Sequence, residues 1–484
     1  MNANAKKGFE SFNLALVDDP LIKKAMAGVM DKIDEAEQDP GRPAFHFRPP
    51  AQWMNDPNGT LYHNGYYHVF YQHNPFGETH GNMHWGHARS RDLVNWEHLP
   101  IALAPSPEKK ESQIFSGCVW IDGDGKPVIL YSSVGAYPRQ QWAAFPEDEE
   151  WIRWKKYEGN PVVTTKANDS LTFNLHMQDP YVFTVGQRTF MVLCGGIEEQ
   201  RVVTLHEAVD ASLLSWEYRG ILYRVTDNSG GYQGYPECPI FFELDHKYVL
   251  LHLGPMMYRV GTFNMDEYTF APELSARMDL GSSFHATNIL EDEKGKVLFS
   301  WIPNSGEYFN QKKGWNGVLA LPRRLSLDSE LRLLQKPAEE LSALRGKAYQ
   351  ASAIPLKPKV NVSVATGTNM LEVIAEFDRH IDAKIGIRFK CAQRKHADFV
   401  IAYNGYRFEF TGKAESARFC NASKKLKIHA FLDKSVIEIF INDGLECATF
   451  SFMPFLHEVT VEAFTELADA EVTALNVWEL KSIW

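Results

Sequence analysis

Strand-like runs that recur at a regular spacing are the feature that most constrains the fold of this 484-residue chain. Five short runs rich in aromatic and β-branched residues each follow a turn, and they are YYHVFYQ at 66–72, PVILYSS at 127–133, RTFMVLC at 188–194, KYVLLHL at 247–253 and KVLFSWI at 296–302. Their first residues lie 61, 61, 59 and 49 positions apart. Trp96, Trp154 and Trp216 form a second series, spaced by 58 and 62 residues.

Two series that agree on a period near 60 residues indicate one structural unit that is repeated. An all-β repeat of this length is typical of a propeller, in which blades of four strands are arranged around an axis. Five units are visible, so the sequence predicts a five-bladed β-propeller. The alternative is a large sandwich whose strands share this spacing by coincidence.

The regions on either side of the repeat have different patterns. Residues 1–43 predict a helical extension, because Asp19-Pro20 is a good helix start and Asp39-Pro40-Gly41 a stop. Apolar residues recur at helical spacing between them, at Ile22, Ala25, Met26, Val29, Met30 and Ile33. The propeller is expected at 44–340, a short helical connector near 336–349, and a β-sandwich at 350–484, where two strands flank Gly444 as a hairpin.

Composition excludes several classes of function. The net charge of −11 argues against nucleic acid and anionic membranes and favours a neutral ligand. Zinc-ligand spacings and Gly-rich phosphate loops are absent from the sequence, so no metal or cofactor is expected, and the six cysteines are interpreted as reduced thiols. With no apolar run of membrane length and no secretory signal at the given start, a cytoplasmic location is expected. The sequence leaves the oligomeric state open.

Three acids stand out by their local context. Asp56 lies in WMNDPNG, which reads as a turn, Asp179 precedes the third run, and Glu237 precedes the fourth. A proline follows each acid, at once or after one residue, and stiffens the backbone there. Each acid alone fits an ordinary solvated turn, but one acid per repeat indicates a shared pocket. Two carboxylates around a sugar-sized site are what glycoside hydrolysis requires.

The ordered motifs resemble those of the family 32 glycoside hydrolases, which include invertases, fructan hydrolases and transfructosylases. The resemblance rests on WMNDPNG, FYQ at 70–72, WGH at 85–87, FSG at 115–117, the Asp179-Pro180 pair and the Glu237-Cys238 pair. It continues in SVIEIFINDG at 435–444, which is similar to the sandwich of that family. It implies an all-β fold, a five-bladed propeller followed by a sandwich, with the site in the propeller.

The resemblance also implies residue roles. Asp56 would be the nucleophile, Glu237 the general acid/base, and Asp179 a stabiliser of the transition state. Glu237 is expected to have a raised pKa beside the other two acids, and Asp56 to lie about 5–5.5 Å from it for a retaining reaction. The further residues expected to contact the substrate are Trp53, Asn55, Gln72, His80, Trp85, Phe115, Ser116, Gln178 and His285.

Four positions depart from the family pattern, and all four are expected on the wall of the terminal sugar site. They are Gln178 for an arginine, His80 for a tryptophan, Ile240 for an acid and His285 for a tyrosine. Gln178 keeps hydrogen-bonding capacity but not charge, so the carboxylates should hold protons more tightly unless a protonated His80 or His285 replaces the cation. Activity should then depend on pH between about 5 and 7, where an unperturbed histidine titrates.

Three hypotheses follow for function. The first is a retaining β-fructofuranosidase that acts on sucrose or short fructo-oligosaccharides. The second is the same chemistry on a different or modified furanoside, or a transfructosylase, and the altered wall predicts that sucrose is a mediocre substrate. The third is a non-catalytic carbohydrate-binding protein on the same scaffold. Release of reducing sugar from a panel of glycosides separates the third from the others.

Overall fold

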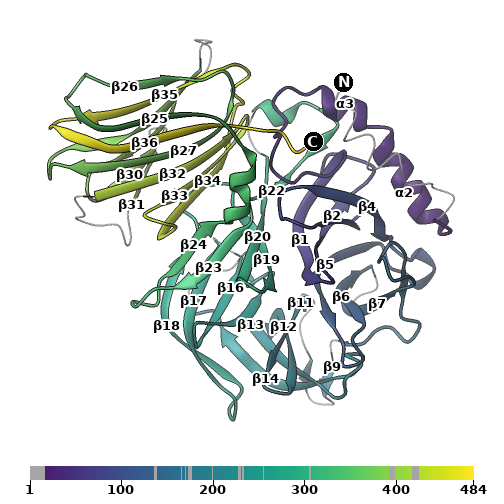
Figure 1. Cartoon of the computed structure of the whole chain (residues 1–484). Helices are drawn as coiled ribbons and strands as arrows, with labels where there is room; N and C mark the ends of the chain where they lie inside the picture. Colours follow the sequence, from purple (N-terminus) through teal and green to yellow (C-terminus); the bar gives the residue numbers. More distant parts are fainter. Residues whose placement is uncertain are drawn as a thin grey trace.

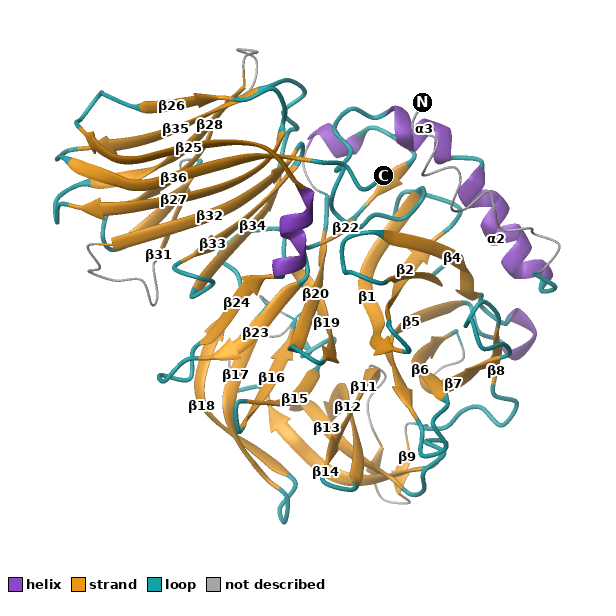
Figure 2. Cartoon of the chain, in the orientation of Figure 1, coloured by secondary structure: helices purple, strands orange, loops and turns teal. Residues whose placement is uncertain are grey.

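A computed structural model shows an all-β molecule with a short helical segment near its N-terminus (Figures 1 and 2). The structure describes residues 17–484 except 136–138, 165, 169–170, 173–176, 199, 227–230, 232–233, 254–255, 305–306, 392–397, 412 and 417–424. The predicted extension is therefore described only from residue 17 onward.

From residue 17 onward, the N-terminal segment forms two short helices where the sequence predicted one. Helix α2 (Pro20–Met30) begins as expected, since the Asp19 carboxylate accepts hydrogen bonds from the backbone N–H groups of Leu21 and Ile22. Its apolar side is buried and α2 contacts the outer strand of the first blade. A turn at 31–32 then redirects the chain into α3 (Ile33–Gln38). The extension therefore packs on its own chain.

Five sheets of the predicted kind follow. The first two are β1 (Gln52–His63), β2 (Tyr66–Asn74), β3 (His84–Ser90) and β4 (Trp96–Leu103), then β5 (Gln113–Ile121), β6 (Pro127–Val134), β7 (Gln140–Pro146) and β8 (Trp154–Lys156). The third is β11 (Gln178–Val185), β12 (Arg188–Ile197), β13 (Gln200–Ala208) and β14 (Trp216–Arg224). The fourth is β15 (Ile240–Leu244), β16 (Lys247–His252), β17 (Met257–Asn264) and β18 (Thr269–Arg277). The fifth is β19 (His285–Asp292), β20 (Gly295–Ile302), β23 (Arg323–Leu327) and β24 (Leu333–Pro337), with β22 (Val318–Leu319) beside β20.

The innermost strands of these sheets form a closed ring. In chain order β1, β5, β11, β15 and β19 each contact the next, and β19 contacts β1. Strand β21 (Trp315–Asn316), from the end of the propeller region, also pairs in parallel with β1. The five-bladed propeller is thus confirmed, and the period near 60 residues is the spacing of its second strands. A separate short hairpin, β9 (Lys166–Asn168) with β10 (Leu171–Thr172), lies between the second and third blades.

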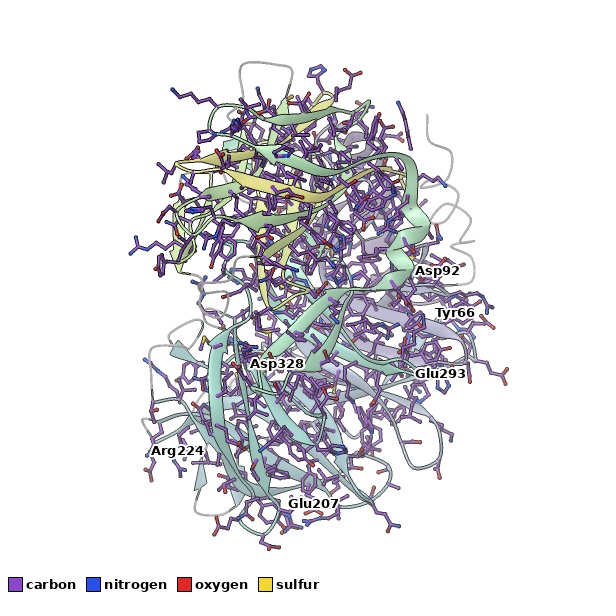
Figure 3. All side chains as sticks on the ribbon, turned by 60° about the vertical axis from the view of Figure 1, so that its left-hand side comes forward. Tyr66, Asp92, Glu207, Arg224, Glu293 and Asp328 are labelled. Carbon is purple, nitrogen blue, oxygen red and sulfur yellow. The ribbon has the colours of Figure 1, made fainter. Side chains whose placement is uncertain are left out.

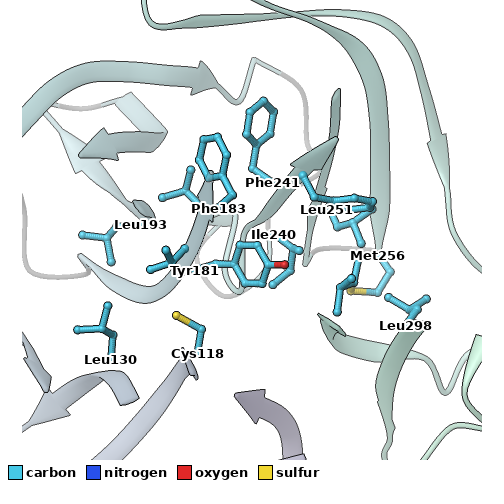
Figure 4. Packing of buried hydrophobic residues seen from close by; sticks show 14 of the residues in the cluster. Cys118, Leu130, Tyr181, Phe183, Leu193, Ile240, Phe241, Leu251, Met256 and Leu298 are labelled. Atoms are coloured by element: carbon cyan, nitrogen blue, oxygen red, sulfur yellow. The ribbon is translucent and has the colours of Figure 1, made fainter. Parts of the chain in front are cut away.

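Side chains from different blades meet in one hydrophobic core. Cys118 of β5, Tyr181 of β11 and Ile240 of β15 pack close together, each less than 10% exposed (Figure 4). Charged side chains such as Glu207 of β13 and Arg224 of β14 lie at the periphery of the propeller (Figure 3). The core therefore joins neighbouring blades and fixes the positions of their inner strands.

Two six-stranded sheets form the C-terminal region. One contains β25 (Arg345–Leu356), β36 (Ala470–Leu480), β27 (Met370–Arg379), β32 (Lys425–Asp433), β33 (Val436–Ile441) and β34 (Glu446–Ser451). The other contains β26 (Val362–Ala365), β35 (Val459–Glu466), β28 (Lys384–Cys391), β29 (Phe399–Tyr403), β30 (Arg407–Phe410) and β31 (Lys413–Ser416). They enclose a second core, as predicted for a sandwich, and β33 and β34 form the expected hairpin.

The connector between the two regions is shorter than the sequence suggested. A 3-10 turn at Glu339–Leu344 is its helical part, and the following residues already belong to β25. A further such turn, Pro107–Lys109, precedes β5, and another at Glu307–Asn310 follows β20.

Within the described part of the chain, no helix is long and apolar enough to cross a membrane. Five cysteines are free thiols, and Cys420 lies outside the described residues.

A buried polar group, here called the seam cluster, joins the propeller to the sandwich. It consists of His46, Asp279, Arg323, Asp433 and Glu438, each at most 5% exposed. The ring of His46 contacts Asp433 through Nδ1 at 2.9 Å and Glu438 through Nε2 at 3.1 Å. Arg323 donates to Glu438 at 2.6 Å and to Asp279 at 3.3 Å. Because every carboxylate has a partner of opposite charge, the cluster couples the two regions without an isolated buried charge.

Candidate active site

Irregularities occur near the start of four innermost strands, at the end of the propeller that is here called its mouth. The pairing register shifts between Met54 and Pro57 in β1, between Ile114 and Gly117 in β5, between Gln178 and Tyr181 in β11, and between His285 and Thr287 in β19. A bulge of this kind redirects side chains locally. The expected site residues from 55–56, 115–116 and 178–179 therefore lie at corresponding places of three blades.

The bulge corrects one prediction. WMNDPNG was expected to be a turn, but it lies inside β1, which spans Gln52–His63. Its proline is tolerated because a bulge leaves a backbone position without a ladder hydrogen bond, so the missing N–H has no cost. The same reasoning applies to Pro180 in β11. The residues that suggested a turn therefore form a bulge in β1, and Asp56 lies at that bulge.

Three backbone positions at the site adopt left-handed conformations. Asp179 has φ 59°, Cys238 has φ 48° and Ala286 has φ 38°. Side chains with a Cβ rarely adopt this region, and such conformations are concentrated at functional sites. The fold holds these residues in place against that preference, in three successive blades.

A directional chain of hydrogen bonds leads to Asp56. Trp53 Nε1 donates to Asn55 Oδ1 at 2.8 Å, and Asn55 Nδ2 donates to Gln72 Oε1 at 3.2 Å. Gln72 Nε2 donates to Ser116 Oγ at 2.7 Å, and the Ser116 hydroxyl donates to Asp56 Oδ2 at 2.6 Å. Each donor fixes the orientation of the next side chain, so the carboxylate at the end of the chain is held in one geometry.

The three predicted acids are brought together by two residues. The backbone N–H of Cys238 donates to Asp179 Oδ2 at 3.0 Å, while its thiol lies 3.6 Å from Asp56 Oδ2. Gln178 Nε2 lies 3.0 Å from Asp179 Oδ2 and 3.4 Å from Glu237 Oε1. The carboxylates of Asp56, Asp179 and Glu237 therefore converge from three different blades, as the sequence predicted.

Burial dominates the electrostatics of Asp179, whose side chain is only 4% exposed. Burial raises its pKa, while the hydrogen bonds from Cys238 and Gln178 lower it, Asp56 raises it and Arg139 lowers it. Among the residues that the structure describes, neither Asp56 nor Asp179 forms a salt bridge. The site thus holds carboxylates close together with weak compensation. No group of three or more His, Cys, Asp or Glu side chains in the described ranges is arranged to hold a metal ion.

Five rings form a continuous arc beside the acids, here called the aromatic arc. The distances between ring centroids are 5.8 Å from His285 to Trp301, 5.6 Å from Trp301 to Trp53, 6.5 Å from Trp53 to His80 and 5.8 Å from His80 to Phe115. All five rings keep solvent-accessible surface, and both histidines are exposed. Partly exposed rings of this kind can pack against the apolar faces of a sugar.

The two histidines of the arc do not replace a missing cation. Desolvation by the surrounding protein lowers the pKa of His80 and of His285, and the charge of Asp56 only partly opposes this. Both imidazoles are therefore neutral near pH 7, because each pKa lies below that of an unperturbed histidine. The expected pH dependence from these residues shifts toward more acidic conditions.

Two expectations about the wall are wrong. Trp85 is fully buried and its Nε1 donates to the carbonyl oxygen of Phe115 at 3.1 Å, so its ring has no surface to offer a sugar. Its role is to position Phe115. Ile240 is 3% exposed and packs in the propeller core, so this departure lies beneath the site instead of on its wall.

Sequence reasoning named Cys238 only as part of a motif, without a role, and missed Ser132 and Arg139 altogether. Cys238 contributes its backbone N–H and its thiol, and Ser132 Oγ accepts a hydrogen bond from the backbone N–H of Asp179 at 2.8 Å. Arg139 lies 5.1 Å from the ring of Phe115. No local sequence motif includes Ser132 or Arg139. They can be recognised as site residues only because the folded chain brings them close to the acids.

The fold and the site together define a class of protein. Carboxylates gathered at the mouth of a propeller, beside partly exposed rings and amide side chains, form the site of a glycoside hydrolase. The chain belongs to glycosyl hydrolases family 32, since the N-terminal domain of that family matches residues 46–337 and its C-terminal domain matches residues 340–479.

Relatives in sequence cover most of the chain. It is 28% identical to a levanase of Bacillus subtilis, over 95% of this chain and 73% of the levanase. It is 30% identical to a sucrose-6-phosphate hydrolase of the same species, over 92% of this chain and 96% of that protein.

Solved structures share the fold. The GH32 beta-fructofuranosidase of Bombyx mori aligns with a TM-score of 0.80 at 25% identity, over 100% of this chain and 99% of that chain. Fructan 1-exohydrolase IIa of Cichorium intybus aligns with a TM-score of 0.79 at 24% identity, over 92% and 98%. The latter likeness supports the fold alone.

Proposed function

We propose that this protein is a retaining glycoside hydrolase that cleaves terminal β-fructofuranosidic bonds in sucrose or short fructo-oligosaccharides. The observation that carries the proposal is the convergence of Asp56, Asp179 and Glu237 through Cys238 and Gln178. The names of the relatives, a levanase and a sucrose-6-phosphate hydrolase, support fructosides as the substrate class.

In the first step Asp56 attacks the anomeric carbon of the fructosyl unit. Ser116 holds Asp56 Oδ2, and Oδ1 has no hydrogen-bond partner within the described ranges, so Oδ1 is the atom that forms the new C–O bond. As that bond forms, the bond to the leaving sugar breaks and Glu237 transfers its proton to the leaving oxygen. The products are a fructosyl ester of Asp56 and the free leaving sugar.

In the second step Glu237, now a carboxylate, takes a proton from water. The resulting hydroxide equivalent attacks the same carbon, the ester bond to Asp56 breaks, and fructose leaves with its original configuration. Asp179 would accept hydrogen bonds from sugar hydroxyls, which strengthen as charge develops in the transition state.

The configuration of the first-formed product tests the proposal. Proton NMR during early turnover of sucrose or kestose should show β-fructofuranose before it equilibrates. An inverted first product contradicts the role of Asp56. A complete lack of turnover on sucrose, kestose, inulin, levan and substituted fructosides contradicts the enzyme itself and leaves a carbohydrate-binding protein.

A further inference from the structure

A second cavity, here called the far cavity, opens at the end of the propeller opposite its mouth. It has a volume of about 540 Å³ and is lined by later residues of the five inner strands, at 60–61, 118–120, 181, 183–184, 242–243 and 288–291. Asp56 and Asp179 lie near the start of two of these strands. At about 3.3 Å per residue along β1, the far cavity lies on the order of 15 Å from Asp56. A ligand held there cannot touch the reacting carbon.

The floor of the far cavity is mainly apolar but contains one unsatisfied hydroxyl. Tyr181 is 7% exposed, and its ring packs beside Cys118 and Ile240 (Figure 4). No residue of the described chain bonds its hydroxyl, which keeps some accessible surface. Burial raises the pKa of the Tyr181 phenol, and so do Cys118 and Glu291. Because Cys118 and Glu291 both line the far cavity, the hydroxyl lies on that side, where a ligand can bond it.

The rim of the far cavity supplies both donors and acceptors of hydrogen bonds. Trp120 is partly exposed, and its indole N–H has no acceptor in the described chain. The exposed carboxylate of Glu243 forms neither a hydrogen bond nor an ion pair with any described residue. Asp245 accepts a hydrogen bond from a backbone N–H at 2.7 Å, and Lys296 pairs with Glu291. Unused donors and an unused acceptor therefore surround the same space.

The chemistry of these groups selects among three classes of ligand. An anion is repelled, because three carboxylates face one lysine. An ammonium group has no acceptor, so a cation would pair with Glu243 but leave the donors of Tyr181 and Trp120 unused. A sugar hydroxyl both donates and accepts, so several hydroxyls can satisfy the carboxylate, the phenol and the indole together. An indole also packs against the apolar face of a sugar, and small-molecule pockets typically measure about 300–1,000 Å³.

We propose that the far cavity is a second sugar-binding site, which takes a neutral mono- or disaccharide and lies outside the reaction centre. Glu243, Tyr181 and Trp120 would bond the hydroxyl groups of that sugar. The inner strands carry residues of both sites, so a bound sugar contacts the elements that present the acids. The inference does not depend on the proposed function, because none of the three predicted acids lines the far cavity.

Counting the sugars bound per chain tests the inference. Equilibrium dialysis uses labelled glucose and fructose with the parent protein, and labelled sucrose with Asp56→Asn, which does not consume it. We expect at least one of these sugars to reach two molecules per chain at saturation.

Two variants should weaken one of the two sites and leave the affinity of the other unchanged. Glu243→Gln should weaken it by about 10-fold or more, since a hydrogen bond to a charged acceptor is lost. Tyr181→Phe should weaken it by about 5-fold, because it removes one neutral hydrogen bond and keeps the ring in the core. The thermal midpoint of each variant shows that it folds.

Glu267→Gln is the matched control, because Glu267 is an exposed carboxylate of the same blade as Glu243, in the turn between β17 and β18, and does not line the far cavity. It should leave both affinities unchanged. Saturation at one sugar per chain, or two sites whose affinities both survive Glu243→Gln and Tyr181→Phe, overturns the inference. A protein that hydrolyses no fructoside but binds two sugars as described would contradict the proposed function alone.

Discussion

Buried carboxylates of the seam cluster and of the site have pKa values that shift in opposite directions, except at Asp279 of the seam, where burial raises the pKa although Arg323 opposes it. In the seam cluster, hydrogen bonds and charges from His46 and Arg323 outweigh burial and lower the pKa values of Asp433 and Glu438. At the propeller mouth, burial raises the pKa of Asp179, and hydrogen bonds from Cys238 and Gln178 only partly compensate. Asp433 and Glu438 are neutralised by their partners, whereas the site carboxylates face one another.

This difference assigns the paired carboxylates to stability and the unpaired carboxylates to reactivity. A buried carboxylate with a cationic partner is inert, because its charge is already satisfied by the protein. A carboxylate without such a partner remains available to a substrate, and the fold bears the cost of holding it there. Substitutions in the seam cluster should therefore change stability, and substitutions at the site should change turnover.

Asp56→Asn should have the largest effect. It removes the nucleophile while keeping the hydrogen bond from Ser116, and kcat should fall by about 10⁴-fold. The thermal midpoint should stay equal or rise, because one of two repelling charges is gone. Turnover of sucrose and calorimetric unfolding measure the two quantities. A clear loss of stability together with the loss of activity would contradict the statement that site substitutions change turnover and leave stability intact.

Arg323→Met should give the next largest effect. It leaves Asp279 buried without a cation and Glu438 with His46 alone, and removing one partner of a buried pair costs about 3–5 kcal/mol. Denaturant unfolding measures the loss, and the folded fraction should keep its kcat. Arg332→Met is the control, since Arg332 forms a more exposed pair with Asp328 and should change stability by at most about 1 kcal/mol.

Glu237→Gln tests whether Glu237 is the proton donor. Hydrolysis of sucrose should fall by about 10²–10³-fold, because the leaving oxygen no longer receives a proton. An aryl fructoside with a good leaving group needs little protonation, so its first step should be largely spared. Pre-steady-state release of the aryl alcohol measures that step. Equal losses on both substrates would contradict the acid role.

The smallest predicted effect is the pH dependence that His46 of the seam cluster gives to the free energy of unfolding. Burial opposes protonation of His46, but Asp433 and Glu438 raise its pKa to about 9. A raised folded-state pKa gives a stabilisation that is complete below the unfolded value of about 6.5 and is lost as pH rises through about 9. Unfolding free energies should fall over this window by about 1–3 kcal/mol. His46→Gln should flatten the slope, and an unchanged slope would contradict the linkage.

Much of the fold was predictable because it depends on local patterns. The period near 60 residues reports one blade, since each blade repeats the same strand lengths and turns. The three acids were found because each lies before one of the recurring strand-like runs and is followed by a proline, at once or after one residue. The turn predicted at Asp56 was wrong, since turn-forming residues also suit a bulge and only pairing with β2 distinguishes the two.

The all-β class, the blade period, the order of propeller and sandwich, and the three acids follow from the amino-acid pattern alone. Three features emerge only in the folded chain: Trp85 is core, Arg139 lies beside Phe115, and His46 meets Asp433 across 387 positions of the chain. These two sets of features differ because the interactions behind them act over different distances along the chain. Strand periodicity and turn chemistry act between near neighbours, whereas burial and charge pairing depend on which distant segments the closed ring brings together.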